Sequence, residues 1–525
     1  NFQFEDITQK SGINAGNHGW HTGVVMADVN GDHFLDIYVC RGAAFEPATD
    51  RANLLFINQK DGTFKEQASQ YGIADTSFSL MANFFDMDND SDLDLVVSNR
   101  PDAFGIKVEQ VVEGRKTAPY IARSKIYRNN GNNTFSDVTR EMGLGETFSY
   151  GLSVTVADLN NDGFQDIYFA NDFNENDYCF LNQGGKSFKE SIRQVTHHTP
   201  FYSMGTDIMD LNSDGLEDIM TVEMLPEDYW RNKVSMAPMV RGEVFDLFFT
   251  SGNTNLQYMQ NVVNLNRGNG WFSDIADLSG MKSTDWSWAV LISDYDNDGM
   301  RDVFITNGYK RDVFDNDAIK KADLQFKDYL KAHDASKGLP ADMNLLKYYP
   351  TVKLVNYMYH NEGQYRFSNH IQKWGLNKES LSQGAATADL DNDGDLDLIV
   401  SNLDEPPFIQ KNNLKGNHAI RIKLNGPGQN TFGLGAKVTV KSGDRQQVEQ
   451  FQTVRGYESS VEPILHFGIG SAKQADEVIV DWNNGTRTVV NQVPCCKVFE
   501  ITSADAKPYA SEAQTKPPLF ADASV

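Results

Sequence analysis

The chain has 525 residues and a net charge of −25, with 72 acidic against 47 basic side chains. So acidic a chain is a poor partner for nucleic acid or for an anionic membrane surface. Its four cysteines are too few for a disulfide scaffold, and its apolar runs are too short for a membrane helix. The length indicates one large domain followed by a smaller one.

An acidic pattern of nine residues occurs six times along the chain. Asp or Asn stands at its first, third, fifth and ninth positions, and Gly at the sixth position of four copies allows a sharp bend. One copy would be typical of a solvated turn, but six copies in register indicate a repeated binding site. The residues are Asp28, Asn30, Asp32 and Asp36; Asp86, Asp88, Asp90 and Asp94; Asp158, Asn160, Asp162 and Asp166; Asp210, Asn212, Asp214 and Asp218; Asp294, Asp296, Asp298 and Asp302; and Asp389, Asp391, Asp393 and Asp397.

Calcium is the ion that these residues fit. Ca²⁺ takes about six to eight oxygen ligands, and the side chains of each loop supply most of them. The seventh position varies in residue type, as expected where only its backbone carbonyl binds. We therefore predict about six Ca²⁺ ions, which would bring the net charge to about −13. The seventh positions are Phe34, Asp92, Phe164, Leu216, Met300 and Asp395.

The residues around each loop predict a propeller blade. The closing Asp runs directly into apolar, β-prone residues, unlike the twelfth-position Glu of an EF-hand, which is flanked by helices. A third strand ending in Asn and a turn into a fourth strand follow, and four short antiparallel strands make a blade. The fold class is therefore an all-β, calcium-binding β-propeller. The expected hairpins of strands three and four span residues 54–68, 125–139, 179–192, 261–276 and 357–371.

The two ends of the repeat array predict how the ring closes. The last repeat has its third strand at 408–412 but no fourth, whereas the chain opens with residues 2–8, which match the missing strand. We expect this N-terminal strand to close the ring, since closure protects strand edges. Six loops indicate six blades, and a seventh blade without metal, hidden in an insertion, is the alternative.

Three insertions explain the uneven spacing of the loops. Residues 101–122 and 226–256 have no clear periodicity. Near 315–349, Asp315 and Asn316 can cap a helix over 318–331, whose apolar residues recur at helical spacing. We expect this helix on one face of the ring, where loops commonly bind partners.

The C-terminal part predicts a small β-sandwich. Alternating apolar strands are expected at 419–424, 436–440, 478–482 and 498–501, with Gly and Asn turns between them. The expected organisation is a propeller at 1–414, a β-sandwich at 415–503, and a linker or the start of a further segment at 504–525.

These motifs resemble known families. The acidic element and its Asn-rich hairpin are similar to the FG-GAP/VCBS repeats of integrin α-subunit propellers and of bacterial surface proteins. Residues 417–502 resemble the ASPIC/UnbV domain of cartilage-acidic-protein-like proteins, although Pro494-Cys495-Cys496 departs from the usual Ala-Asn-Gln. Residues 284–312 are similar to Bacteroidetes VCBS-repeat proteins encoded beside TonB-dependent SusC/SusD-type importers. That resemblance implies an outer-membrane lipoprotein that acts in nutrient uptake.

One aligned position, eight residues before each loop, is mostly aromatic. It holds Trp20, Phe78, Tyr150, Tyr202, Trp286 and Leu381, with His21 and Trp288 beside it. These side chains either pack between blades or form an aromatic funnel that stacks a sugar or peptide. No nucleophile, base and orienting group stand together in the sequence as a catalytic triad.

We therefore expect a non-catalytic, calcium-stabilised surface binding protein, an accessory subunit of a SusCD-type uptake complex for glycan or peptide. Two alternatives remain: an integrin-like adhesion or matrix protein, and a hydrolase or lyase that uses the funnel. Open calcium sites usually need the calcium concentration found outside the cytosol. The chain also begins at Asn1, as in a processed product. We expect an extracytoplasmic, outer-membrane location, with membrane contact only through a lipid anchor or a partner.

Overall fold

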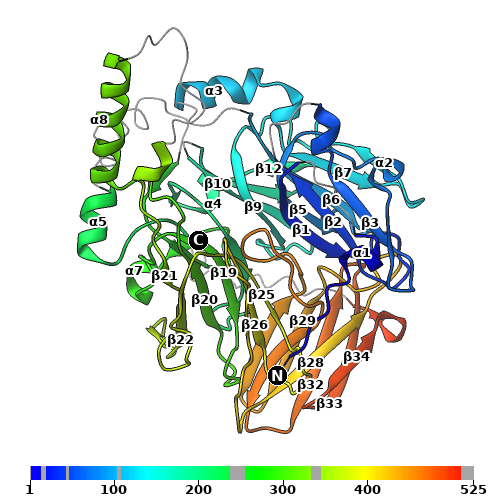
Figure 1. Ribbon diagram of the computed structural model, residues 1–525. Coiled ribbons are helices and arrows are strands. Elements are labelled where there is room, and N and C mark those ends of the chain that lie inside the picture. Colours follow the sequence, from blue (N-terminus) through cyan, green and yellow to red (C-terminus); the bar gives the residue numbers. More distant parts are fainter. Residues whose placement is uncertain are drawn as a thin grey trace, which may run out of the picture.

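The fold is all-β, with a ring of small sheets above a two-sheet sandwich (Figure 1). The computed structural model describes residues 2–13, 19–42, 47–102, 108–173, 175–236, 255–332 and 345–509. Within these residues, no helix is both long enough and apolar enough to cross a membrane.

The ring consists of six antiparallel sheets in chain order, which we call blades 1 to 6. Five have four strands and the sixth has three. Blade 1 contains β1 (His21–Ala27), β2 (Asp36–Arg41), β3 (Leu54–Asn58) and β4 (Phe64–Glu66). Blade 2 contains β5 (Phe78–Phe85), β6 (Asp94–Arg100), β7 (Lys125–Asn129) and β8 (Phe135–Asp137). Blade 3 contains β9 (Tyr150–Ala157), β10 (Asp166–Asp172), β11 (Tyr178–Asn182) and β12 (Phe188–Glu190).

The second half of the ring repeats this order with small additions. Blade 4 contains β14 (Thr206–Met209), β15 (Asp218–Thr221), β17 (Val262–Asn266) and β18 (Phe272–Asp274). Blade 5 contains β19 (Ser287–Ser293), β20 (Asp302–Asn307), β22 (Tyr357–Asn361) and β23 (Phe367–Asn369). Blade 6 contains β25 (Ser382–Ala388), β26 (Asp397–Asn402) and β27 (Phe408–Gln410). Two short pairs lie outside the blades: β13 (His198–Pro200) with β16 (Leu256–Tyr258), and β21 (Leu354–Val355) with β24 (Glu379–Ser380).

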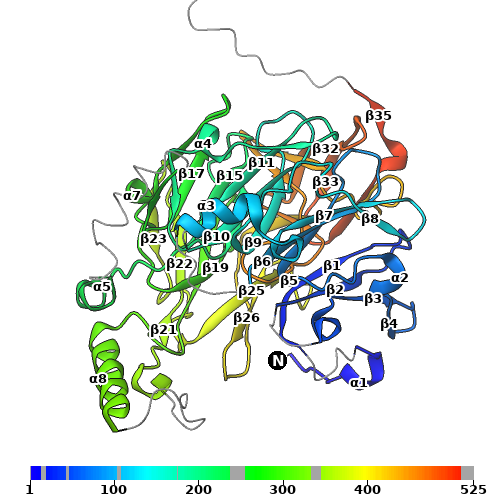
Figure 2. The same cartoon turned by 90° about the horizontal axis from the view of Figure 1, so that it is seen from above.

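Each blade packs its innermost strand against that of the next, from β1 through β25 (Figure 2). The apolar run after each acidic loop forms the second strand, which is buried on both faces, as in β6 and β20. The described residues contain no seventh sheet of this kind, so the six loops correspond to six blades.

The join between the last and first blades differs from expectation. Residues 2–7 form no strand, Phe4 is exposed, and blade 6 keeps only three strands. A segment of the C-terminal domain lies at the join instead. The Ser460 hydroxyl donates to the Val24 carbonyl of β1 at 3.0 Å, and the Glu462 N–H donates to the Thr387 carbonyl of β25 at 3.3 Å. This segment can reach both blades because it continues from the sandwich, which is fixed beneath them.

The helices are short, apart from those in the insertions. Asp315 accepts hydrogen bonds from the N–H groups of Asp317 and Ala318, and so caps α8 (Asn316–Ala332) where the sequence predicts a helix. In Figure 1, α3 and α8 lie away from the sandwich. Parts of all three predicted insertions (103–107, 237–254 and 333–344) lie outside the described residues. The other helices are α1 (Thr8–Ser11), α2 (Ala68–Tyr71), α3 (Val108–Thr117), α4 (Ile192–Val195), α5 (Tyr229–Met236) and α7 (Ala276–Ser279), with short 3₁₀ turns η1 (Ala48–Arg51), η2 (Tyr120–Ala122), η4 (Leu345–Tyr348) and η5 (Ser503–Asp505).

The C-terminal sandwich consists of a three-stranded and a five-stranded sheet. Its interior side chains and those of blades 1 to 3 form one continuous buried cluster. Residues 507–508 pair with β33, so the sandwich extends past 503; residues 510–525 lie outside the described range. Its strands are β28 (His418–Asn425), β29 (Lys437–Ser442), β30 (Arg445–Gln450), β31 (Leu465–Gly470), β32 (Gln474–Trp482), β33 (Thr486–Pro494), β34 (Val498–Thr502) and β35 (Lys507–Pro508).

Candidate metal centre

Each acidic loop connects the first two strands of its blade. All six loops share one backbone conformation, in which the fourth and sixth positions have positive φ. The sixth position is Gly in blades 3 to 6. In blades 1 and 2 it is His33 and Ser91, two residues with side chains whose backbone nevertheless adopts the left-handed conformation. Two left-handed residues within three positions bend the chain sharply. The carboxylates before and after the bend therefore face each other.

Backbone N–H groups orient the first carboxylate of each loop. In blade 3, both oxygens of Asp158 accept hydrogen bonds, from Asp162 N–H at 3.0 Å and from Gly163 N–H at 2.8 Å. The same pair of bonds recurs in the other five blades. These bonds fix the direction of the carboxylate before any ion binds, which preorganises the loop.

The ninth carboxylate connects the loop to the third strand. In blade 3, Asp166 accepts from Leu159 N–H at 2.9 Å and from Asn182 N–H at 2.7 Å. The side-chain amide of Asn182 donates to the carbonyl of Met87 in the preceding blade at 2.8 Å. Asn266 and Asn412 make the equivalent link between blades 4 and 3 and between blades 6 and 5. The sequence showed an Asn ending each third strand, but its pairing partners could not be read from the repeat.

The carboxylates of a loop converge on a common point. In blades 2, 5 and 6, three carboxylate oxygens per loop lie within 4.8 Å of one another. Burial, together with neighbouring carboxylates, raises the pKa of Asp86 to about 7 and that of Asp218 to about 8. Buried, mutually repelling carboxylates with few cationic partners are the donor set that a hard divalent cation requires, so the residues fit Ca²⁺. The predicted carbonyl ligand at the seventh position stays a prediction.

The loop of blade 6 has two cationic partners, more than any other loop among the ion pairs of the described residues; in blade 5, His360 alone pairs with two carboxylates. Lys411 pairs with Asp391, and lies 3.1 Å from Asp393. The Arg421 guanidinium of the sandwich lies 2.7 Å from Asp389. Two cationic side chains therefore already partly neutralise the loop that has the most regular acidic sequence. We expect its affinity for calcium to be the lowest of the six.

The sandwich contacts every one of the six loops. Gln429 and Asn430 both donate through their backbone N–H groups to the Ser91 carbonyl in blade 2, at 2.8 Å. Lys437 bridges blades 3 and 4 by donating to Asn161 and to the Gly215 carbonyl. The remaining contacts are Thr431 with Asp28, Arg445 with the Asp298 carbonyl, Asn417 with the Asp296 carbonyl, His466 with Asn297, and Arg421 with Asp389. The candidate calcium loops thus form the interface between the two domains, which no sequence motif predicted.

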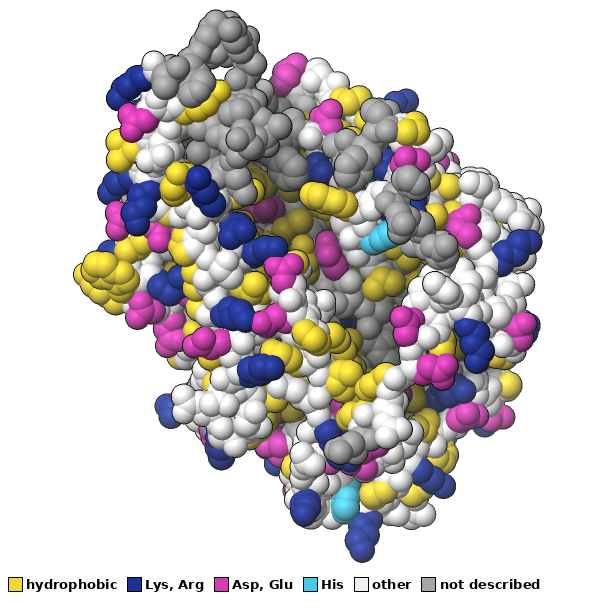
Figure 3. All heavy atoms as spheres, viewed as in Figure 1, with side chains coloured by type: hydrophobic (Ala, Val, Ile, Leu, Met, Phe, Trp, Pro, Cys, Tyr) yellow, Lys and Arg dark blue, Asp and Glu magenta, His cyan; other side chains and the backbone are white. Residues whose placement is uncertain are grey.

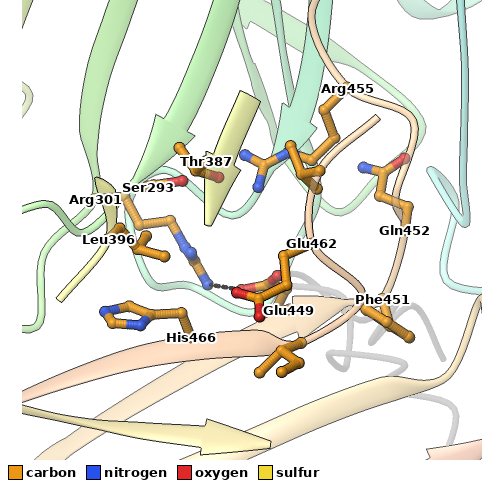
Figure 4. A pocket seen from close by; sticks show the side chains of 12 residues that line it. Ser293, Arg301, Thr387, Leu396, Glu449, Phe451, Gln452, Arg455, Glu462 and His466 are labelled. Atoms are coloured by element: carbon orange, nitrogen blue, oxygen red, sulfur yellow. Dashed lines mark hydrogen bonds and ion pairs between the residues drawn. The ribbon is translucent and has the colours of Figure 1, made fainter. Parts of the chain in front are cut away.

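A polar cavity lies where the sandwich meets the middle of the ring (Figure 4). Arg455 enters from the sandwich and forms a two-pronged ion pair with Asp207, with distances of 2.9 and 2.6 Å. Arg301 of blade 5 pairs with Glu449 of the sandwich at 2.9 Å. The four side chains are buried, and breaking such a pair on one side leaves an uncompensated charge. These pairs therefore hold the two domains in one register.

The predicted aromatic funnel is largely buried. Phe78, Tyr150, Tyr202 and Trp286 are all below 10% exposed, as is Leu381, whereas Trp20 is 68% exposed. Trp286 stacks on Tyr309 with ring centroids 3.6 Å apart. Arg51 and Arg100 lie over the ring of Phe78, at 4.5 and 5.2 Å from its centroid. Buried rings with these contacts correspond to the packing alternative. Of the other two funnel residues, His21 is exposed and Trp288 is half-buried.

Comparison with known proteins adds sequence relatives for both domains. Residues 426–508 match the ASPIC and UnbV family model, and residues 117–169 and 158–221 match the FG-GAP-like repeat. Cartilage acidic protein 1 from Xenopus tropicalis is 24% identical over 528 residues, covering 85% of this chain and 75% of the relative. The protein of the same name from Homo sapiens is 23% identical over 495 residues, covering 88% and 69%.

Two solved structures share only a distant likeness. A lectin from Agrocybe aegerita that recognises non-reducing terminal N-acetylglucosamine has a TM-score of 0.36 and 16% identity, covering 75% of this chain and 81% of that one. An exotype rhamnogalacturonan lyase has a TM-score of 0.33 and 12% identity, covering 91% and 73%. Scores this low carry no argument about function.

Proposed function

We propose that this chain is a non-catalytic binding protein whose propeller is stabilised by calcium. The chain carries FG-GAP-like repeats and a C-terminal ASPIC and UnbV domain, and it is homologous to cartilage acidic protein 1. The matched repeats and domain suggest a binding protein of the β-propeller type. One observation carries the calcium part of the proposal: six loops share one backbone conformation, and in blades 2, 5 and 6 three carboxylate oxygens of the loop lie within 4.8 Å of one another. Calcium supplies the positive charge that these buried carboxylates lack.

The binding surface follows from where the sandwich lies. Because the sandwich covers the loop face, the opposite face of the ring is left for a partner. That side carries α5 and α8, where Tyr229 and Trp230 expose most of their aromatic surface. In the view of Figure 3, hydrophobic side chains are visible in the middle of the molecule, with acidic and basic side chains among and around them. Exposed aromatic side chains such as these are typical of protein contact sites.

Calcium binding is tested by counting bound ions and measuring stability together. Equilibrium dialysis of chelator-treated protein against Ca²⁺ is expected to give close to six ions per chain, with the weakest at blade 6. Asp90→Ala removes a ligand of blade 2 and is expected to lower the count by one, whereas Asp328→Ala on the exposed side of α8 leaves it unchanged. Absence of calcium uptake by the unaltered protein, or an unchanged count in Asp90→Ala, would contradict the proposal.

The partner that we propose is a SusC/SusD-type outer-membrane transporter, with this chain as its surface-exposed, lipid-anchored accessory subunit for glycan or peptide uptake. The support is the similarity of residues 284–312 to VCBS-repeat proteins encoded beside such importers, together with the exposed aromatic pair on α5. Purification of the native protein from its membrane is expected to recover a β-barrel transporter. Trp230→Ala is expected to reduce that recovery, and Trp271→Ala, at an exposed Trp on another hairpin, serves as the control.

A matrix or adhesion protein is the second candidate function, and its support is the homology to cartilage acidic protein 1. The same purification separates the two. Recovery of extracellular matrix components without a transporter would favour adhesion, and in that case the importer proposal would be wrong.

A further inference from the structure

A second cluster of metal-ligand side chains lies on the sandwich, far in sequence from the acidic loops. Cys495 and Cys496 follow β33 and form a disulfide with each other, and His418 begins β28 beside them. The two Sγ atoms and an imidazole nitrogen all lie within 4.8 Å of one another. No acidic loop shares these residues, and Cys495 and Cys496 stand where the sequence departs from the family pattern named above. We propose that, once the disulfide is reduced, Cys495, Cys496 and His418 bind one thiophilic d¹⁰ metal ion such as Zn²⁺.

One pair of the proposed ligand atoms already has the separation that tetrahedral coordination requires. Cys496 Sγ lies 3.6 Å from His418 Nδ1. Metal–sulfur and metal–nitrogen bonds of about 2.3 and 2.05 Å at a tetrahedral angle place their ligand atoms about 3.6 Å apart. The Sγ atom and the imidazole therefore need little movement, and only the two sulfurs must separate to admit the ion. Two thiolates and an imidazole leave a fourth position for water or an external ligand.

The surrounding backbone holds the three side chains together. Cys495 N–H donates to the Lys473 carbonyl at 3.0 Å, and Cys496 N–H donates to the Ala419 carbonyl at 3.4 Å. Ala419 directly follows His418 on β28, so the Cys496 backbone is tied to the strand that carries the imidazole. Cys496 is exposed, and Cys495 and His418 are half-buried, which leaves the cluster open to an ion and to a reductant.

The oxidation state of Cys495 and Cys496 controls whether the site can bind a metal ion. A dithiol reductant transfers two electrons and two protons to the Cys495–Cys496 disulfide and becomes a disulfide itself, which leaves two thiols. Binding of Zn²⁺ then displaces the two thiol protons. The other two cysteines do not compete, because burial raises the pKa of the Cys40 and Cys179 thiols well above the ordinary range.

Cobalt substitution tests the site in the full-length chain. The protein is reduced with a phosphine, desalted under argon, saturated with Ca²⁺ to fill the acidic loops, and titrated with Co²⁺. A thiolate-to-cobalt charge-transfer band is expected to saturate at about one Co²⁺ per chain and to disappear on adding Zn²⁺. Without reduction no such band is expected. The band reports sulfur ligands only, so carboxylate sites do not contribute to it.

Three variants assign the ligands. Cys495→Ser is expected to reduce the band by at least about half, because only one thiolate remains, and His418→Ala to weaken Co²⁺ binding about tenfold or more, since one of three protein ligands is lost. The matched control is His197→Ala, at an exposed histidine between blades 3 and 4, which is expected to bind Co²⁺ as the unaltered protein does. Melting of each variant in calcium verifies folding. A reduced, unaltered protein without the band, or a band of equal strength and affinity in Cys495→Ser or His418→Ala, would overturn the proposal.

Discussion

The bend of each acidic loop depends on single residues that accept a left-handed backbone. Gly163 of blade 3 has φ of 89°, and a Cβ built on it would meet no atom within 4 Å. A substitution here therefore tests backbone conformation without steric contact. Asn tolerates this conformation far better than Ala does, because its short polar side chain can bond locally.

We expect Gly163→Ala to lower the free energy of unfolding by about 1 kcal/mol, because Ala resists the left-handed conformation. Gly163→Asn is expected to cost clearly less. Urea denaturation in calcium measures both variants. Equal losses for Ala and Asn would show that the conformational argument is wrong at this position.

A buried carboxyl beside the ring's aromatic cluster predicts a pH dependence. Burial raises the pKa of Glu223 to about 8, although one of its carboxyl oxygens accepts a hydrogen bond from the Met224 N–H at 2.7 Å. The folded chain therefore keeps this proton up to about pH 8, whereas the unfolded chain releases it near the ordinary Glu value of about 4.3. The stability associated with the protonated form is present at acid pH and is lost as the pH rises from about 4 to 8.

Glu223→Gln removes this titration while keeping the shape of the side chain. We expect its melting temperature to exceed that of the unaltered protein at pH 8 by several degrees, and the difference to shrink toward pH 5. Glu113→Gln, at an exposed position of α3, is the control and should show no such trend. A difference that is constant with pH would exclude the proposed titration.

At the scale of the element, the six loops share one hydrogen-bond scheme but differ in charge. Lys411 and Arg421 together pair with three carboxylates of blade 6. Among the ion pairs of the described residues, blade 5 comes next, because His360 lies 3.1 Å from Asp302 and 3.6 Å from Asp296, and these carboxylates raise the pKa of His360 to about 9. A cation near the ligands opposes a second cation by Coulomb repulsion, by about 1 to 4 kcal/mol at 4 Å for effective dielectric constants between 80 and 20. A loop can therefore have a regular sequence and still bind weakly.

We expect Lys411→Ala to tighten the weakest calcium site by about tenfold, as one nearby positive charge is removed. Calorimetric titration of chelator-treated protein resolves that site from the tighter ones. Lys60→Ala, which removes a more exposed partner of Asp32 in blade 1, is expected to have a smaller effect. If Lys411→Ala leaves the calcium affinity of the weakest site unchanged, the charge of Lys411 is not the cause of its low affinity.

At the scale of the whole molecule, the loops and the sandwich depend on each other. Thr431 and Arg421 reach first-position carboxylates directly, and Gln429 and Asn430 bond to the backbone of the blade 2 loop. Removal of calcium would leave clustered carboxylates that repel each other, and the loops would rearrange beneath the sandwich. An ion that binds only the folded state stabilises it by mass action.

Chelation is therefore expected to lower the melting temperature by many degrees and to loosen the domain interface first. Hydrogen exchange should rise early at the amides of Gln429, Asn430 and Gly470, which bond to loops, and late within the β32–β33 pair of the sandwich. Magnesium, which prefers a smaller octahedral shell, is expected to restore protection poorly. A melting temperature that is unaffected by chelation, or exchange that begins in β32 and β33, would contradict this view.

Local chemistry was readable from the chain itself. Asp, Asn and Gly at fixed spacing define loops and hairpins because these residues bond to their own backbone and accept left-handed conformations within a few positions. The hairpins β3–β4 and β22–β23, the helix α8 with its Asp315 cap, and the alternating strands of the sandwich all follow from such short-range patterns. The number and order of the repeated loops and hairpins predicted the ring of blades.

Long-range placement was decided only by the tertiary structure. The N-terminal residues 2–7 match a fourth strand in sequence, yet a segment around Ser460 holds the join, because the sandwich brings it there. Likewise, Asp207 and Arg455 stand 248 positions apart, and nothing local to either of them specifies the other. Whether an aromatic side chain such as Trp286 faces a ligand or packs under Tyr309 also depends on neighbours brought in from elsewhere. The sequence by itself determined the repeated loops and blades, because the interactions that form them act over a few residues. The tertiary structure decided that the sandwich covers the loop face and that most of the aligned aromatic side chains are buried, because these contacts join segments that only the folded chain brings together.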